Sequence, residues 1–128
     1  TVDNQVKSEL NNLFKQIKAN TKFDYRELKT YKYQDNIDHN FILNGTGYRK
    51  VAELYGDVSK IKLDLFTDQP GLQVYNTPYP SQGDRICLET QHFPDAIHHQ
   101  NDANWPSIIL DVNEQYYSKT TYQFSKNS

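Results

Sequence analysis

Residues 60–76 read KIKLDLFTDQPGLQVYN, and this stretch carries the clearest fold signal in the chain. Its first part, IKLDLF, alternates apolar with charged residues, which is the two-residue period of a half-buried strand. TDQPG then has the composition of a turn, with Pro70 preset for the first corner and Gly71 able to take positive φ at the second. The following LQVYN is expected to be the partner strand. The stretch therefore predicts an antiparallel hairpin.

Further strands are expected where short apolar runs are separated by turn signals. They cover residues 50–55, 86–91, 107–112 and 116–124. Strands this close together favour an antiparallel β-sandwich over βαβ units. The chain has 128 residues, enough for one domain with a hydrophobic core. We therefore predict a mainly β fold, with residues 1–128 as a single domain.

Residues 3–20, DNQVKSELNNLFKQIKAN, follow a different pattern. Their apolar residues recur at steps of three and four, which predicts one amphipathic helix. Asp3 or Ser8 is a candidate N-cap, and the several Asn residues weaken the helical preference. Such a helix would pack on the β portion, residues 21–124, or dock on a partner.

Composition narrows the classes of partner. Lys and Arg number 14 against 16 Asp and Glu, for a net charge of −2, and no basic run marks a nucleic-acid surface. No apolar stretch approaches the roughly 20 residues that span a bilayer. Ten Tyr and six Phe supply much of the apolar surface for a core. The single cysteine, Cys87, excludes an internal disulfide and predicts a reducing compartment, the cytoplasm.

Residues 86–99, ICLETQHFPDAIHH, contain the densest group of titratable side chains. In a strand, Glu89 would share a face with Cys87 and Gln91, opposite the apolar residues. If that face is exposed to solvent, Glu89 is an ordinary surface carboxylate. If it lines a cleft, desolvation would raise the pKa of Glu89 and make it a usable general base.

The histidines of this stretch are less informative. His92, Asp95, His98 and His99 match no ligand spacing of a known metal motif, so we expect loop residues and no metal site. Cys87 lies between two apolar residues, with nothing adjacent that would lower its pKa, so it is not expected to be a nucleophile.

Residues 36–44, NIDHNFILN, form a second cluster. Asp38 and His39 precede an apolar run there. Asp38 is either a turn residue that binds local backbone amides or an acceptor for ligand hydroxyls.

Taken together, five stretches resemble the C-terminal part of the aldose 1-epimerase (galactose mutarotase) family. They are TKFDYRE (21–27), DHNFILN (38–44), TDQPGLQVYN (67–76), CLETQHFPDAIHH (87–99) and TTYQF (120–124). The resemblance implies part of an all-β supersandwich that interconverts the α and β anomers of free hexoses, galactose or glucose, without a cofactor. By motif match, Glu89 is the general base and Asp38 binds sugar hydroxyls.

The sequence also departs from the family pattern. The family's general acid is a histidine in an NHxYFNL-type motif that this sequence lacks, and none of its four histidines lies in an equivalent motif. The resemblance covers about the last third of a full-length member. The alternatives are a non-catalytic carbohydrate-binding or interaction module, or a fold that keeps these motifs only for packing. Exposed sheet edges would be covered by the N-terminal helix, by self-association or by a missing N-terminal portion.

Overall fold

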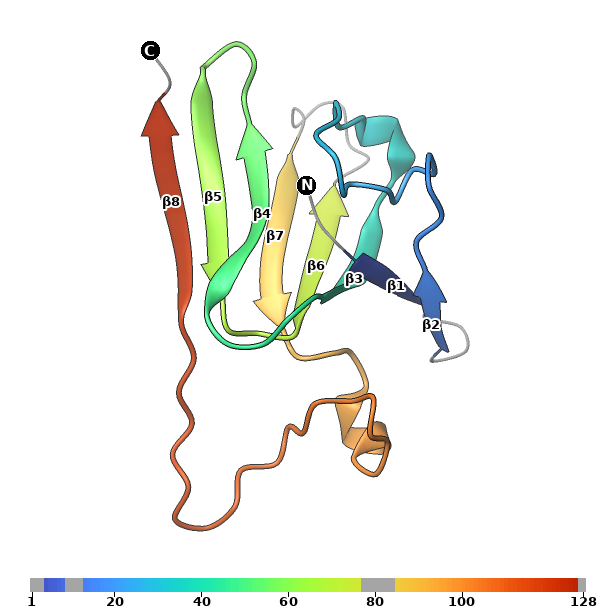
Figure 1. The fold of residues 1–128 in the computed structure, drawn as a ribbon, viewed down its shortest axis with the longest axis vertical. Helices are drawn as coiled ribbons and strands as arrows, with labels where there is room; N and C mark the ends of the chain where they lie inside the picture. The colour runs from blue at the N-terminus through green and yellow to red at the C-terminus, as the bar shows by residue number, and fades with distance from the viewer. Residues whose placement is uncertain (1–3, 9–12, 77–84, 127–128) are drawn as a thin grey trace.

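The computed structural model describes residues 4–8, 13–76 and 85–126, and its fold is mainly β (Figure 1). The strands are β1 (Asn4–Ser8), β2 (Leu13–Gln16), β3 (Asp38–Leu43), β4 (Arg49–Tyr55), β5 (Ile61–Thr67), β6 (Gly71–Asn76), β7 (Ile86–Gln91) and β8 (Thr120–Lys126). Two short 3-10 helices, η1 (Tyr33–Asp35) and η3 (Ala96–His99), lie outside the sheets. One sheet has the order β2-β1-β3-β6-β7 and the other β4-β5-β8. The prediction of a mainly β, antiparallel fold is confirmed.

The predicted hairpin of residues 60–76 is wrong. Both strands form, but β5 pairs with β4 and β8, whereas β6 pairs with β3 and β7 in the other sheet. The linker between them crosses from sheet to sheet. The guanidinium of Arg49 donates to the carbonyl of Thr67 at the end of β5 and to that of Gln69 in the linker (3.1 and 3.3 Å). Gly71 does not take the positive φ expected of a turn corner; it is the first residue of β6. A period of two fixes which side chains share a face, but it does not fix which strand lies alongside.

The predicted helix of residues 3–20 is also wrong for the residues described. β1 and β2 are antiparallel strands, with Val6 opposite Lys15, and residues 9–12 lie outside the described part. β1 also pairs with β3, placing Val6 opposite Phe41. Because β1 pairs with a strand on each side, its backbone N–H and C=O groups find hydrogen-bond partners in the sheet. The Asn-rich sequence has a weak helical preference, so tertiary pairing overrides the local pattern.

Residues 107–112 form no strand, which corrects another expectation. Ile109 and Leu110 are about half exposed (47% and 55%) in an extended segment that leads from η3 to β8. The hydroxyl of Ser118 and the backbone N–H of Lys119 then bind the carboxylate of Asp68 (3.0 and 3.1 Å), which fixes the approach to β8. An apolar run makes a strand only where another strand accepts its hydrogen bonds.

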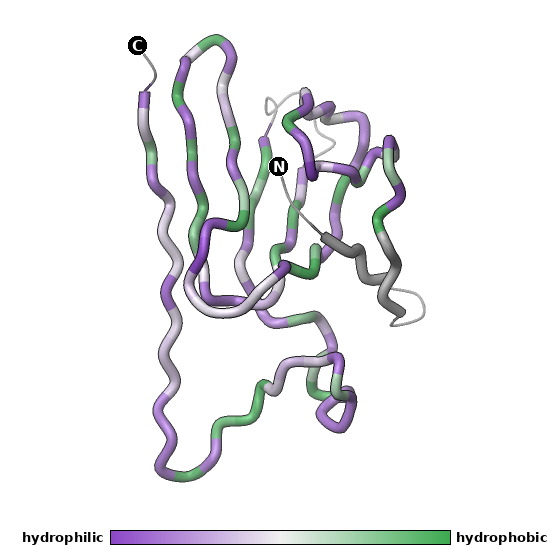
Figure 2. The backbone as a smooth tube through the Cα atoms, in the orientation of Figure 1, coloured by the Kyte–Doolittle hydropathy of each residue, from purple (hydrophilic) through white to green (hydrophobic). Residues whose placement is uncertain are grey.

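The two sheets share one hydrophobic core. Phe41 and Leu72 of the larger sheet and Leu65 of the smaller sheet are all fully buried and belong to one cluster. Figure 2 shows hydrophobic and hydrophilic residues alternating along β5. Burying a side chain of this size contributes roughly 1.5–3 kcal/mol. A second, smaller cluster of Phe93, Ala96 and Trp105 packs against Ile42 on the other face of the larger sheet.

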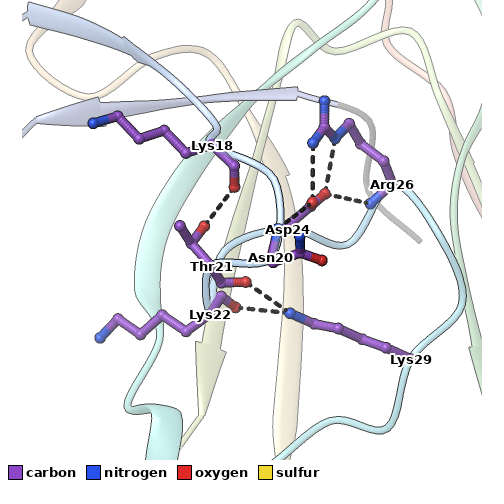
Figure 3. A network of polar contacts seen from close by, with 7 residues as sticks. All are labelled: Lys18, Asn20, Thr21, Lys22, Asp24, Arg26 and Lys29. Atoms are coloured by element: carbon purple, nitrogen blue, oxygen red, sulfur yellow. Dashed lines mark hydrogen bonds and ion pairs between the residues drawn. The ribbon is translucent and has the colours of Figure 1, made fainter.

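The loop that follows β2 is held by polar contacts (Figure 3). The carboxylate of Asp24 accepts hydrogen bonds from the Arg26 side chain (2.8 and 2.9 Å) and from the backbone N–H of Asn20 (3.0 Å). The bond from Arg26 is the main reason why the pKa of Asp24 lies well below its usual range. Lys29 donates from Nζ to the carbonyl of Thr21 (3.0 Å). These bonds give a loop without helix or strand a fixed course beside the core. No helix in the described ranges is long and apolar enough to cross a membrane.

Candidate active site

β7 separates apolar from polar side chains. Ile86 and Leu88 face inward and pack against the core cluster. Because neighbouring residues of a strand point to opposite faces, Cys87, Glu89 and Gln91 lie on the outer face. The predicted division of this strand into two faces is confirmed.

Strand register brings the two predicted site residues to the same face. Glu89 of β7 lies opposite Gln73 of β6, which lies opposite Asn40 of β3. Asp38 is two residues from Asn40 and therefore shares its face. We call this surface the polar face; it consists of Asp38, Asn40, Gln73, Glu89 and Gln91. Two strand spacings across and two residues along put the backbones of Asp38 and Glu89 roughly 12 Å apart.

Gln73 connects the two halves of the polar face. Its Nε2 donates to Oδ1 of Asp38 (2.7 Å), and its Oε1 accepts from Nε2 of Gln91 (3.3 Å). Gln91 Nε2 also donates to Oδ1 of Asn40 (3.2 Å). Sequence reasoning missed Gln73. The available signal was its outward position in LQVYN, in a strand whose other face is apolar.

Glu89 is exposed, and its carboxylate makes no hydrogen bond or ion pair with the residues that the structure describes. Its carboxylate oxygens are therefore available to a ligand. Asp38 is also exposed, and within the described residues only one of its carboxylate oxygens is occupied, by Gln73. The two carboxylates thus flank an amide and present free acceptor positions, which suits recognition of a molecule rich in hydroxyl groups.

Three of the four histidines have positions defined by contacts away from Glu89. His39 follows Asp38 and points to the opposite face, where its ring contacts Phe23 at 4.6 Å. His98 Nδ1 binds the carboxylate of Asp95 in the loop after β7, and the His99 ring stacks on Trp105 at 3.9 Å. In the ranges that the structure describes, no three His, Cys, Asp or Glu side chains are grouped as metal ligands.

A family model described as aldose 1-epimerase matches residues 4–123.

The chain belongs to the aldose 1-epimerase family.

Among curated members, this aldose 1-epimerase family chain is 32% identical to the galactose mutarotase of Rattus norvegicus over 126 residues, covering 82% of the chain and 35% of the relative. It is 31% identical to galactose mutarotase from Homo sapiens over 105 residues, covering 71% and 30%. It is 29% identical to aldose 1-epimerase from Escherichia coli (strain K12) over 131 residues, covering 83% and 37%. The chain thus spans about a third of the length of the curated relatives that it matches.

Proposed function

We propose that this chain carries the base-bearing half of a hexose mutarotation site, in which Glu89 is the general base and Asp38 binds sugar hydroxyls. The observation that carries the proposal is the polar face. There Glu89 of β7, whose carboxylate has no partner among the described residues, and the half-occupied Asp38 of β3 lie on either side of Gln73 of β6. Family membership supports a sugar as ligand. Galactose and glucose are the hexoses to test first.

The proposed reaction needs two proton transfers. Glu89 takes the proton from the anomeric hydroxyl while a proton donor protonates the ring oxygen. The bond between C1 and the ring oxygen breaks, and the C1–O1 bond becomes the carbonyl of the open-chain aldehyde. After rotation about C1–C2, the ring oxygen attacks the other face of the carbonyl and the two protons return. The chemistry is balanced without a cofactor.

We further propose that the proton donor comes from a polypeptide equivalent to the part of the relatives that this chain does not span. A cavity of about 760 Å³, lined in part by Leu54, Val74 and Leu88, lies between the sheets. Phe124 lies on the same face of its sheet as the buried Leu65, yet it is 68% exposed. Such a polypeptide would fill this space and complete a sandwich. If sedimentation shows a monomer and a hydrophobic dye does not bind to it, the chain has no uncovered apolar face.

The function is tested by polarimetry on freshly dissolved α-D-galactose and α-D-glucose. When the chain is assayed together with the donor-bearing polypeptide and Glu89 is a working base, the approach to equilibrium is faster than in buffer, and Glu89→Gln lowers the catalysed rate about 10²–10⁴-fold. Glu27→Gln is the matched control, because Glu27 is exposed and lies outside the polar face. A rate that stays unchanged in Glu89→Gln would contradict the assignment of the base.

A non-catalytic carbohydrate-binding module is the second candidate. The observation that favours it is the separation of His39, His98 and His99 from Glu89, which leaves the base without a histidine partner among these three. In that case the polarimetric rate equals that of buffer, hexose titration still saturates, and Asp38→Ala weakens binding. If the chain shows neither catalysis nor saturable binding, the motifs have a packing role only. The single Cys87 supports a reducing compartment such as the cytoplasm for either candidate.

A further inference from the structure

The side-chain amides of the polar face form an ordered chain. Asp38 accepts from Gln73, Gln73 accepts from Gln91, and Gln91 also donates to Asn40, with distances of 2.7, 3.3 and 3.2 Å. Asn40 is only 4% exposed, whereas Asp38 is exposed. This series of hydrogen bonds therefore runs from the buried side chain of Asn40 to the solvent-exposed carboxylate of Asp38.

The negative charge of Asp38 determines which group donates and which accepts in each of these hydrogen bonds. A carboxylate only accepts hydrogen bonds, so Gln73 must present its NH₂ group to Asp38. The carbonyl oxygen of Gln73 then points to Gln91 and requires a donor there. Gln91 has two N–H groups on Nε2, one for Gln73 and one for Asn40. The amide nitrogen of Gln91 supplies both donors from one atom.

Gly71 makes room for the side chain of Asn40. A Cβ built on Gly71 would lie 2.5 Å from Oδ1 of Asn40 and 3.2 Å from its Nδ2, so the Asn40 side chain lies directly over the Gly71 backbone. Gly71 is opposite Gln91 across the ladder between β6 and β7. A glycine at this place lets the side chain of Asn40 cross β6 and reach Gln91.

We infer that Gln91 is a positioning residue for the sugar-binding carboxylate: held by Asn40 over Gly71, it fixes the amide of Gln73, which in turn fixes Asp38. The inference rests on the proposed function for the identity of the ligand, whereas the hydrogen bonds that order Asp38 do not depend on it. With Gln91 in place, one oxygen of Asp38 is held by Gln73 and the other is aimed at the ligand. In this arrangement Gln91 acts on Asp38 through Gln73.

The geometry is tested first without any sugar, by hydrogen exchange of the Gln73 side-chain amide followed by NMR. Gln91→Leu removes both donors at similar volume, and we expect the protection of the Gln73 amide to fall about tenfold, the effect of one hydrogen bond of ordinary net strength. Gln91→Met is the second variant, in case the branched side chain disturbs the strand. Gln123→Leu is the matched control, an exposed glutamine on β8 of the other sheet. Unchanged exchange in both Gln91 variants would overturn the inference.

The consequence for the ligand is tested by a double-mutant cycle on the Kd for D-galactose. Gln91→Leu should weaken binding about tenfold in the wild-type background and have almost no effect in the Gln73→Leu background, because it acts through Gln73. Equal weakening in both backgrounds would mean a general structural role and would overturn the inference. If the wild-type chain binds no galactose, the proposed function fails, and the exchange experiment still decides whether Gln91 orders Gln73.

Discussion

At the scale of single residues, the properties of this chain depend on which face a side chain occupies. Glu89 and Leu88 are adjacent in sequence, but Leu88 packs against the core and Glu89 is exposed on the polar face. A carboxylate in an apolar run is thus accommodated without burial. The same alternation separates Asp38 from His39, and it brings Asp38 to the side of Glu89 and Gln73.

Gly71 offers a test at this scale. Because its φ is not positive, an alanine would suit the backbone, and the cost of Gly71→Ala should arise from contacts of the new Cβ, first with Oδ1 of Asn40 at 2.5 Å and then with the backbone carbonyl of Gln91 at 3.1 Å. We expect a loss of about 1–3 kcal/mol in the free energy of unfolding, measured by urea denaturation. In the Asn40→Ala background the additional loss should be smaller, because only the contact with the Gln91 carbonyl remains. Additive losses would show that the contact with Asn40 contributes nothing to the cost.

At the scale of elements, β7 and β8 belong to different sheets but meet through side chains. The hydroxyl of Thr120 on β8 lies 2.8 Å from that of Thr90 on β7 and 3.0 Å from that of Thr67 on β5. The hydroxyl of Tyr122 on β8 donates to the backbone carbonyl of Leu88 on β7 (2.7 Å). These contacts join the strand that carries Glu89 to the second sheet.

Thr120→Val tests this link, because it replaces a hydroxyl by a methyl group and keeps the β-branched shape. Thr67 is fully buried, so it loses a partner that water does not replace. We expect about 1–2 kcal/mol of destabilisation in chemical denaturation. Thr46→Val, at an exposed position between the strands, is the control and should change stability by less than about 0.5 kcal/mol. A loss no larger than that of the control would contradict the link.

At the scale of the whole molecule, the stability should depend on pH through carboxylates paired with cations. Hydrogen bonds from Arg26 lower the pKa of Asp24, and those from Lys50 lower the pKa of both Glu53 and Asp64. A group whose pKa is lower in the folded state stabilises that state above its unfolded pKa, and the stabilisation is lost as pH falls through the folded pKa.

The expected result is a urea midpoint that is steady above about pH 5 and falls as the solution is acidified toward pH 3. Lys50→Gln should flatten this dependence, because it removes the main hydrogen-bond donor of Glu53 and Asp64. Lys32→Gln, at an exposed position, is the control and should leave the profile as in the wild type. An unaltered profile in Lys50→Gln would show that these pairs contribute nothing.

Several features could be predicted from sequence because they depend on the local period of the chain. The bounds of β7 were predicted as residues 86–91, and those of β4, β5 and β6 within one residue. The division of β7 into an apolar and a polar face followed from alternation alone. The candidate roles of Glu89 and Asp38 came from motif resemblance and remain predictions.

The sequence by itself determined the β class, most strands and the face on which Glu89 lies, since these follow from a two-residue period. Only the tertiary structure decided that β5 and β6 belong to different sheets and that residues 4–8 and 13–16 are strands. It also decided that Gly71 serves a side chain of β3 instead of a turn, and that Gln73 lies between Asp38 and Gln91. The physical reason is that backbone hydrogen bonds between strands are made with partners distant in sequence, and no local pattern names the partner.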